Sequence, residues 1–200
     1  MAAAVAGGGI FVALAATVAR RAPGAFDLTA WRLAGELRTP AGVSIAAGLS
    51  FFGTGWGLAA VAAALTIYLL AWRRDFWALA PAVIMGLAAA VMQVTKDVVS
   101  RPRPPAPVFV VPGWSYPSGH STATAALAVA AWLLLGRSRR WRWLLLLYPL
   151  LVGASRVYLR AHWATDVLGG WSLGVAVVAL AVAANPVPQP RRRRRSRAAH

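Results

Sequence analysis

The stretch of sequence that decides the fold is residues 163–184, WATDVLGGWSLGVAVVALAVAA, in which Asp166 is the single charged side chain. A helix needs about 20 consecutive apolar residues to cross the hydrocarbon core of a bilayer. Inside that core every backbone N–H and C=O group must be paired within the protein, so a spanning segment of this composition is expected to be helical. We therefore predict that this stretch is a transmembrane helix with a carboxylate near its N-terminal end.

Five further apolar runs of this length, or close to it, precede that helix. Tryptophan residues stand at or near the ends of several runs, where their amphipathic rings favour the headgroup zone of a bilayer. The sequence therefore predicts an all-α polytopic membrane protein with six transmembrane helices. The predicted spans cover residues 2–19, 54–72, 77–95, 119–135, 143–157 and 163–184.

The composition is typical of a membrane protein. Hydrophobic residues make up 59% of the 200 residues, only 13% of the residues are charged, and the mean hydropathy is +0.60. The net charge of +16 does not indicate a nucleic-acid partner, because the arginines stand in short clusters between apolar runs rather than over one face. The chain has no cysteine, so neither a disulfide framework nor a thiolate metal site is expected.

The arginine clusters orient the predicted helices. Cytoplasmic loops carry an excess of Arg and Lys, and an N-terminus inside the cell puts all three clusters on the cytoplasmic side. Arg20 and Arg21 disagree with this topology, because they then lie outside, directly after the first span. A cleaved signal peptide is the alternative for the first run, although no positive n-region precedes it. The clusters are Arg73 and Arg74; Arg137, Arg139, Arg140 and Arg142; and Arg191 to Arg195 with Arg197.

Two segments outside the spans carry their own predictions. Residues 26–38 place apolar side chains at helical spacing among charged ones, which indicates an amphipathic helix lying on the membrane; an ordinary polar loop fits equally well. Before the second span, Ser50 and the glycines at 53, 55 and 57 indicate a break or kink. We expect one transmembrane domain over residues 1–185 and a basic, disordered cytoplasmic tail over residues 186–200.

The ionisable residues outside the arginine clusters converge on one side of the predicted membrane. The ends of spans three and five and the starts of spans four and six all lie on the extracytoplasmic face in this topology. Charged groups at membrane depth are costly and by default mark function. Cations and histidines that meet at one face therefore predict an anion site. The residues are Lys96, Asp97, Arg101, Arg103, His120, Arg156, Arg160, His162 and Asp166.

Two parts of this set have a specific chemical reading. His162 and Asp166 are four residues apart, so on a helix they share a face, and the carboxylate would hold one ring nitrogen protonated while the other acts as a nucleophile. Pro117 stops any preceding helix, and Ser118 is the expected N-cap of the fourth span, which leaves first-turn amides free to bind an anion. Gly119 lets a phosphate approach the backbone closely.

Three cations complete the predicted phosphate site. Lys96, Arg103 and Arg156 would neutralise the equatorial oxygens of a phosphoryl group during its transfer. Pro102 and Pro104 hold the segment around Arg103 extended. Each of these residues taken alone has a plainer reading as a helix cap or a headgroup anchor, but their joint pattern favours an active site. Asp97, Arg101 and Arg160 lie nearby in the sequence and are not expected to be catalytic.

These residues resemble the motifs of the type 2 phosphatidic acid phosphatases, a superfamily that also includes bacterial acid phosphatases and vanadium haloperoxidases. The first motif, Lys, six residues, Arg, Pro, matches residues 96–104. The second, Pro-Ser-Gly-His, matches residues 117–120, and the third, Ser-Arg, five residues, His, three residues, Asp, matches residues 155–166. All motif positions are occupied in the right order, over about a third of the chain.

The resemblance implies a two-step phosphoryl transfer with no metal and no other cofactor. His162 would attack phosphorus to give a phosphohistidine that Asp166 orients and stabilises, while His120 protonates the leaving oxygen and later deprotonates water. The sequence has no carboxylate cluster that would hold magnesium, which agrees with this scheme. The phosphate oxygens would be held by Lys96, Arg103, Arg156 and the amides around Ser118 and Gly119.

The expected function is that of an integral membrane lipid phosphate phosphatase in a bacterial cell membrane, with an extracytoplasmic active site. The substrate stays open among a polyprenyl diphosphate, phosphatidic acid and phosphatidylglycerol phosphate, and so does the oligomeric state. The expected partners are the lipid phosphate and membrane lipids, not nucleic acid. The alternatives are a non-catalytic protein that binds or transports lipid phosphates in the same basic pocket, and the vanadate chemistry of the soluble haloperoxidase branch. Pure binding needs cations but no oriented histidine pair, which argues against the first.

Overall fold

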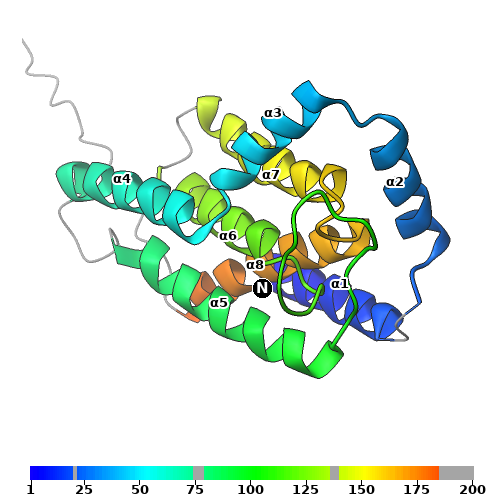
Figure 1. Cartoon of the computed structure of the whole chain (residues 1–200). Coiled ribbons are helices and arrows are strands. Elements are labelled where there is room, and N and C mark those ends of the chain that lie inside the picture. The colour runs from blue at the N-terminus through cyan, green and yellow to red at the C-terminus, as the bar shows by residue number, and fades with distance from the viewer. Residues whose placement is uncertain (20–21, 74–78, 136–139, 185–200) are drawn as a thin grey trace, which may run out of the picture.

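Helices are the regular elements of the structure, a computed structural model that describes residues 1–19, 22–73, 79–135 and 140–184. Their order along the chain can be followed in Figure 1. The all-α prediction is confirmed. The elements are α1 (Ala2–Val18), α2 (Ala25–Glu36), α3 (Pro40–Phe51), α4 (Gly55–Arg73), α5 (Ala80–Val99), α6 (Gly119–Leu134), a 3₁₀ helix η2 (Arg140–Leu146), α7 (Leu147–Tyr158) and α8 (Ala164–Ala184).

Each of the six predicted spans overlaps a helical segment, but the helices differ in length relative to the thickness of a bilayer. Within the described ranges α5 and α8 are each long and apolar enough to cross a membrane, and α3 with α4 pass as one bent pair. The helices α1, α6 and the segment from Trp143 to Tyr158 are apolar but shorter. The structure is therefore that of an all-α membrane protein with two or three clear membrane-length elements, and the count of six spans stays a prediction.

The predicted break before the second span is confirmed. The axes of α3 and α4 differ by 53°. Thr39 caps the start of α3, where its hydroxyl accepts a hydrogen bond from the Gly42 amide at 3.0 Å. At the bend, a Cβ on Gly57 would lie 2.2 Å from the Phe51 carbonyl oxygen, so the chain can turn this tightly only with glycine there.

The predicted amphipathic segment is a helix, α2, and its large apolar side chains face outward as a helix on a membrane surface requires, but one of its charged side chains is buried. Phe26 and Leu37 are 60% and 67% exposed, whereas the Asp27 side chain is buried. Apolar side chains that face outward suit contact with lipid. The expectation that the charged residues of this segment face water is thus wrong for Asp27, because a buried partner, described below, pairs with it.

The centre of the bundle is the close contact between α6 and α8. A Cβ on Gly170 would lie 2.7 Å from the Ser118 carbonyl oxygen, and one on Gly174 would lie 2.6 Å from that of Thr122. Small residues let membrane helices approach at backbone distance. This approach brings the N-terminal ends of α6 and α8 together, and both ends carry residues of the predicted site.

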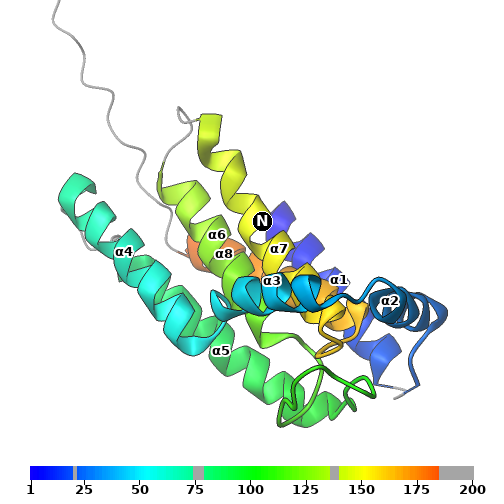
Figure 2. The same ribbon diagram turned by 45° about the horizontal axis from the view of Figure 1, so that its top comes forward.

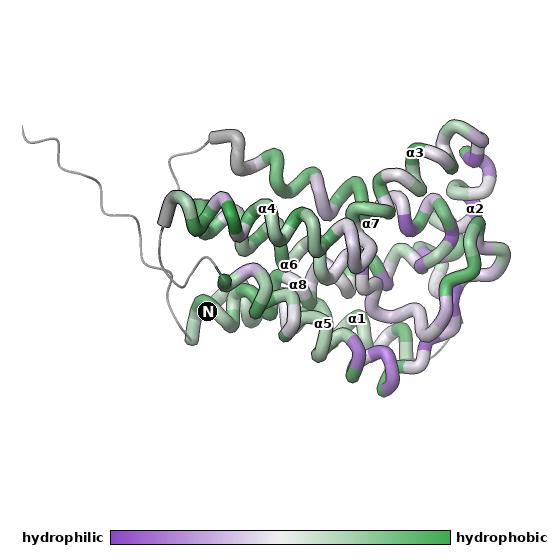
Figure 3. Tube along the Cα trace, turned by 60° about the vertical axis from the view of Figure 1, so that its left-hand side comes forward, coloured by the Kyte–Doolittle hydropathy of each residue, from purple (hydrophilic) through white to green (hydrophobic). Residues whose placement is uncertain are grey.

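The polar part of the molecule lies at one end of the bundle. Figures 1 and 2 place α2 and the connection from α5 to α6 there, and Figure 3 shows that hydrophilic stretches gather at the same end while the rest of the helices are hydrophobic. Most of the arginines on which the predicted topology depends, for or against, lie outside the described residues. They are Arg20, Arg21, Arg74, Arg137, Arg139 and the tail at 186–200.

Candidate active site

Backbone hydrogen bonds tie three distant segments together at the polar end. Ser100 ends α5 in the left-handed conformation, with φ of 47°, and its amide donates to the Lys96 carbonyl at 2.9 Å. The chain then loops back, and the Ser115 amide donates to the Arg101 carbonyl at 2.8 Å. The Ser118 amide donates to the Asp166 carbonyl at 3.0 Å. The end of α5, the start of α6 and the start of α8 therefore meet.

His162 lies between a carboxylate and a guanidinium. Its Nδ1 is 3.5 Å from Asp166 Oδ2, and its Nε2 is 3.1 Å from Arg103 Nη1. A guanidinium has only donors, so Nε2 must be the acceptor, and we assign the ring proton to Nδ1 on the side of Asp166. The ring stands in the turn before α8 rather than on the helix itself. The four-residue spacing still brings the pair together.

The Asp166 carboxylate is fully buried and surrounded by donors. Besides facing His162, it accepts hydrogen bonds from the Trp163 amide at 2.9 Å, from the Ser115 hydroxyl, and from Arg101 Nη1 at 2.5 Å. A buried carboxylate needs such donors to remain ionised. Sequence reasoning missed Ser115 and set Arg101 aside, since neither occupies a motif position.

Arg103 uses every N–H group it has. Its Nε and Nη2 donate to carbonyl oxygens of the segment 112–114, at 2.9 to 3.2 Å. Its Nη1 donates to the Ala161 carbonyl at 2.8 Å and faces His162 Nε2. A guanidinium has five N–H donors, so an incoming phosphate oxygen has to replace one of these partners. If the phosphate oxygen replaces His162 as the partner of Nη1, the lone pair on His162 Nε2 becomes free for nucleophilic attack.

The other two predicted cations, Lys96 and Arg156, are close enough to this pair to act on its charges. Lys96 Nζ donates to the Trp114 carbonyl at 2.6 Å, an oxygen that it shares with Arg103. Arg156 is buried, and its Nη1 donates to the Ser50 hydroxyl at 2.6 Å, while its Nε has no hydrogen-bond partner among the residues that the structure describes. A buried N–H without an acceptor favours an anion. Over the described ranges no group of three or more His, Asp or Glu side chains is placed to hold a metal ion.

His120 stands in the first turn of α6, as predicted. The charges of Arg103 and Arg156 act on its ring as they do on the ring of His162, so the two histidines share one cation site. Its Nε2 is buried and has no hydrogen-bond partner among the described residues. A ring nitrogen in this position is available for exchanging a proton with a bound substrate.

The start of α6 differs in one respect from the prediction. Ser118 is the N-cap, and its hydroxyl accepts from the Ser121 amide at 3.4 Å. The Ser118 amide is not free for an anion, in contrast to the prediction, because the Asp166 carbonyl accepts from it. The amides of Gly119 and His120 have no acceptor in the described part of the chain. The Ser118 amide thus fixes α6 to α8, and the next two amides are the ones left to bind an oxyanion.

Burial controls the protonation of the loop residues in the site. It lowers the pKa of His162 to about 4, although Asp166 acts in the opposite direction by stabilising the protonated ring. Arg103 and Arg156 add to the lowering by charge repulsion. The His162 ring is therefore neutral near pH 7, which a nucleophile requires. Burial also lowers the pKa of Arg103.

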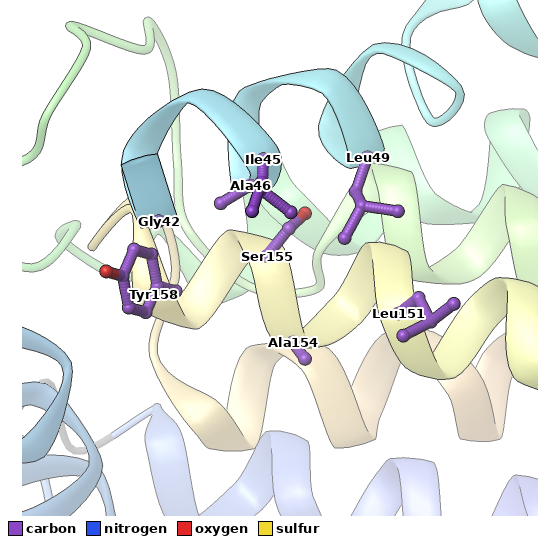
Figure 4. Close-up of a pocket in the computed structure, with 8 residues that line it drawn as sticks. All are labelled: Gly42, Ile45, Ala46, Leu49, Leu151, Ala154, Ser155 and Tyr158. Atoms are coloured by element: carbon purple, nitrogen blue, oxygen red, sulfur yellow. The ribbon is translucent and has the colours of Figure 1, made fainter. Parts of the chain in front are cut away.

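An apolar groove of about 310 Å³ lies between α3 and α7 (Figure 4). Along both helices the groove is next in sequence to the cation site: Arg156 follows the lining residue Ser155 in α7, and Ser50, which pairs with Arg156, follows the lining residue Leu49 in α3. At its outer end the Tyr158 hydroxyl accepts from the Thr39 amide at 3.0 Å. The lining residues are Gly42, Ile45, Ala46 and Leu49 of α3 and Leu151, Ala154, Ser155 and Tyr158 of α7.

The chain is similar to known proteins in both sequence and fold. Residues 77–187 match the profile of the PAP2 superfamily. The chain is 29% identical to phosphatidylglycerophosphatase B of Bacillus subtilis (strain 168) over 85% of its length and 88% of the relative's. It is 35% identical to an undecaprenyl-diphosphatase of Sulfolobus acidocaldarius over 64% of its length and 65% of the relative's. The fold is similar to the crystal structure of a transmembrane PAP2-type phosphatidylglycerolphosphate phosphatase from Bacillus subtilis, with a TM-score of 0.84, 26% identity, and coverage of 96% of this chain and 100% of that one.

Proposed function

Because the chain belongs to the PAP2 superfamily and is a membrane lipid phosphatase, we propose that it hydrolyses its substrate through a phosphohistidine on His162. One observation carries this proposal: the His162 ring is held with Nδ1 toward the Asp166 carboxylate at 3.5 Å and Nε2 toward the Arg103 guanidinium at 3.1 Å. The nitrogen with the free electron pair thus points at the cation that would bind the phosphate. A purely binding site has no need of this orientation.

The first half of the reaction begins when a phosphate oxygen replaces His162 at Arg103 Nη1. Nε2 of His162 then attacks phosphorus, the bond from phosphorus to the leaving oxygen breaks, and His120 donates a proton to that oxygen. The new phosphohistidine carries positive charge on its ring. Asp166, which faces the protonated Nδ1, offsets this charge.

The second half of the reaction releases inorganic phosphate. His120, now without its proton, takes one from a water molecule, whose oxygen attacks phosphorus while the bond from phosphorus to Nε2 of His162 breaks, which restores the free imidazole. In both halves the negative oxygens would be held by Lys96, Arg103, Arg156 and the Gly119 amide, while Ser118 keeps the start of α6 in place.

For the substrate we propose a lipid phosphate, with a polyprenyl diphosphate, phosphatidic acid and phosphatidylglycerol phosphate as the three candidates. The names of the relatives support the first and the last of these classes. The groove between α3 and α7 adds a physical reason, because its apolar lining starts beside Arg156 and suits an acyl or isoprenyl chain whose phosphate lies in the cation site.

We also propose that the protein crosses a bacterial cell membrane six times, with its N-terminus inside and the active site on the extracytoplasmic side. The match of each predicted span to a helix supports this arrangement. The gathering of the hydrophilic stretches at one end of the bundle supports it as well (Figure 3). We expect lipid and the substrate to be the partners of this surface, and no nucleic acid.

The proposed function is tested by phosphate release from purified protein in detergent micelles, with a panel of polyprenyl and glycerolipid phosphates. We expect turnover of at least one of them, in the presence of EDTA, and none with His162→Ala. Turnover by His162→Ala would refute the nucleophile. Tight binding of every lipid phosphate without turnover by the unmodified chain would favour the alternative of a binding or transport protein.

A further inference from the structure

A buried chain of charges runs from α2 to the carboxylate behind His162. The side chains of Asp27, Arg101 and Asp166 are 2%, 1% and 0% exposed. Arg101 Nη2 lies 2.6 Å from Asp27 Oδ2, and Arg101 Nη1 lies 2.5 Å from Asp166 Oδ1. One guanidinium thus joins carboxylates from two helices that are far apart in the sequence.

Asp27 is also bound to the helix that carries Asp166. Its Oδ1 accepts from the Thr165 amide at 2.9 Å, and its Oδ2 accepts from the Thr165 hydroxyl at 2.7 Å. Thr165 lies in the first turn of α8, where a negative charge is favourable because the N–H groups of the turn point toward it. Arg101 completes the arrangement, since its Nη1 donates to the Thr165 hydroxyl at 2.7 Å.

From this arrangement we propose that Arg101 and Asp27 are positioning residues of the phosphatase, which hold the Asp166 carboxylate ionised and aligned with Nδ1 of His162. The inference rests on the proposed function, because it assigns a task to Asp166 that only a histidine nucleophile gives it. Neither residue touches the place where the phosphate would bind, so both act through Asp166 and are not catalytic themselves.

Arg101 is the cation in direct contact with Asp166 among the residues described. Lys96 and Arg103 act on Asp166 only from a longer distance, since their hydrogen bonds go to carbonyl oxygens and to His162. Removal of the Arg101 charge would leave the Asp27 and Asp166 carboxylates buried without the guanidinium that binds both of them. Like charges in a buried site are strongly unfavourable, so one of the two would take up a proton. A protonated Asp166 could no longer offset the charge of a phosphohistidine.

Asp27 supplies the second anchor of Arg101. A guanidinium binds two carboxylates at fixed geometry because its donors lie in one rigid plane. With Asp27 holding Nη2, rotation of the guanidinium about its own axis is blocked, and Nη1 stays directed at Asp166 Oδ1. A lysine at position 101 would keep the charge but could not form both contacts in the same way.

The test compares Arg101→Gln, Arg101→Lys and Asp27→Asn with a matched control, Arg160→Gln. Arg160 also binds α2: its guanidinium carbon lies 3.9 Å from the Trp31 ring centroid, and its Nε donates to the Trp31 carbonyl at 3.1 Å. Unlike Arg101, it makes no hydrogen bond or ion pair with Asp166. Each variant is assayed for kcat, for KM and for competitive inhibition by inorganic phosphate.

We expect Arg101→Gln to lower kcat about 10- to 100-fold at an unchanged KM, as loss of an orienting partner does at other sites. Arg101→Lys should recover part of kcat, and Asp27→Asn should lower kcat less than Arg101→Gln does. The double variant, with Asp27→Asn and Arg101→Gln together, should have a kcat no lower than that of Arg101→Gln alone, because both residues act through one carboxylate. Inorganic phosphate should still inhibit all variants, and Arg160→Gln should keep kcat.

The proposal is overturned if Arg101→Gln keeps the kcat of the unmodified chain. It is also overturned if Arg160→Gln lowers kcat as much as Arg101→Gln does, because the effect of Arg101 would then come only from its role in holding α2 in place. If Arg101→Gln fails to insert into membranes, Asp27→Asn decides, and an unchanged kcat there overturns the proposal. Failure of the proposed function itself looks different: His162→Ala would then remain active.

Discussion

Alanine at position 53 would press directly on the ring of His120. A Cβ on Gly53 would lie 2.6 Å from His120 Cδ2 and 2.7 Å from Val152 Cγ1, whereas ordinary contacts of such atoms lie at 3.4 to 4 Å. To restore ordinary contacts the His120 ring therefore has to shift by about 0.8 Å, and the Val152 methyl group by about 0.7 Å. A displacement of about 1 Å in an active site costs about 100-fold in rate, or about 2.7 kcal/mol of activation free energy.

We expect Gly53→Ala to lower kcat about 100-fold with little change in the inhibition by inorganic phosphate, because the three atoms nearest the added Cβ belong to His120 and Val152 and not to a cation of the site. The measurement is phosphate release in detergent micelles, together with thermal unfolding to verify that the variant is folded. Gly48→Ala is the matched control, since Gly48 lies in α3, shortly before the break that contains Gly53, and a Cβ there meets no atom within 4 Å. A folded Gly53→Ala variant with undiminished kcat, or an equal loss in Gly48→Ala, would refute the role of His120 at this position.

Three further perturbations address other parts of the site. Asp166→Asn should lower kcat by about ten-thousand-fold, as the corresponding change does in the serine-protease triad; a folded variant with a nearly normal kcat would remove Asp166 from the reaction. Since burial lowers the pKa of His162 to about 4, its ring should stay neutral as the pH falls from about 8 to about 5. Nitrogen NMR of the imidazole measures this, and the His162→Gln variant identifies the signal by its loss. Titration of the ring near the ordinary histidine pKa of about 6.5 would contradict the prediction. Ala154→Trp should fill the groove between α3 and α7 and displace about two methylene groups of a bound chain, at about 0.8 kcal/mol each, which raises KM for a lipid phosphate about 10-fold. A water-soluble phosphate ester should be hydrolysed as before, and an equal effect on both substrates would rule out the groove as the path of the chain.

The helices and the residues at the motif positions could be predicted because both leave a local signal. A run such as residues 163–184 is long and apolar enough to indicate a helix without any knowledge of its neighbours. The break at residues 52–54 was foreseen for the same reason, since glycines signal it directly. His162 and Asp166 are near enough in sequence for their contact to follow from spacing.

The support behind Asp166 could not be predicted, because it depends on tertiary contacts. Asp27 lies in a helix whose pattern suggested a solvent-facing carboxylate, and only the return of the 100–118 loop over the start of α8 brings Arg101 to it. The use of the Ser118 amide was missed for the same reason. Its acceptor, the Asp166 carbonyl, lies on another helix. Spacing along the chain gives no sign of either contact.

The most direct measurement of the central claim is to trap the covalent intermediate. The unmodified chain is mixed with a lipid phosphate that carries a labelled terminal phosphoryl group, quenched within one turnover in alkali, where phosphohistidine survives, and digested for mass spectrometry. We predict a phosphoryl group on the peptide that contains His162, absent when that residue is replaced by alanine. Label on His120 instead, or rapid turnover with no labelled peptide, would contradict the account.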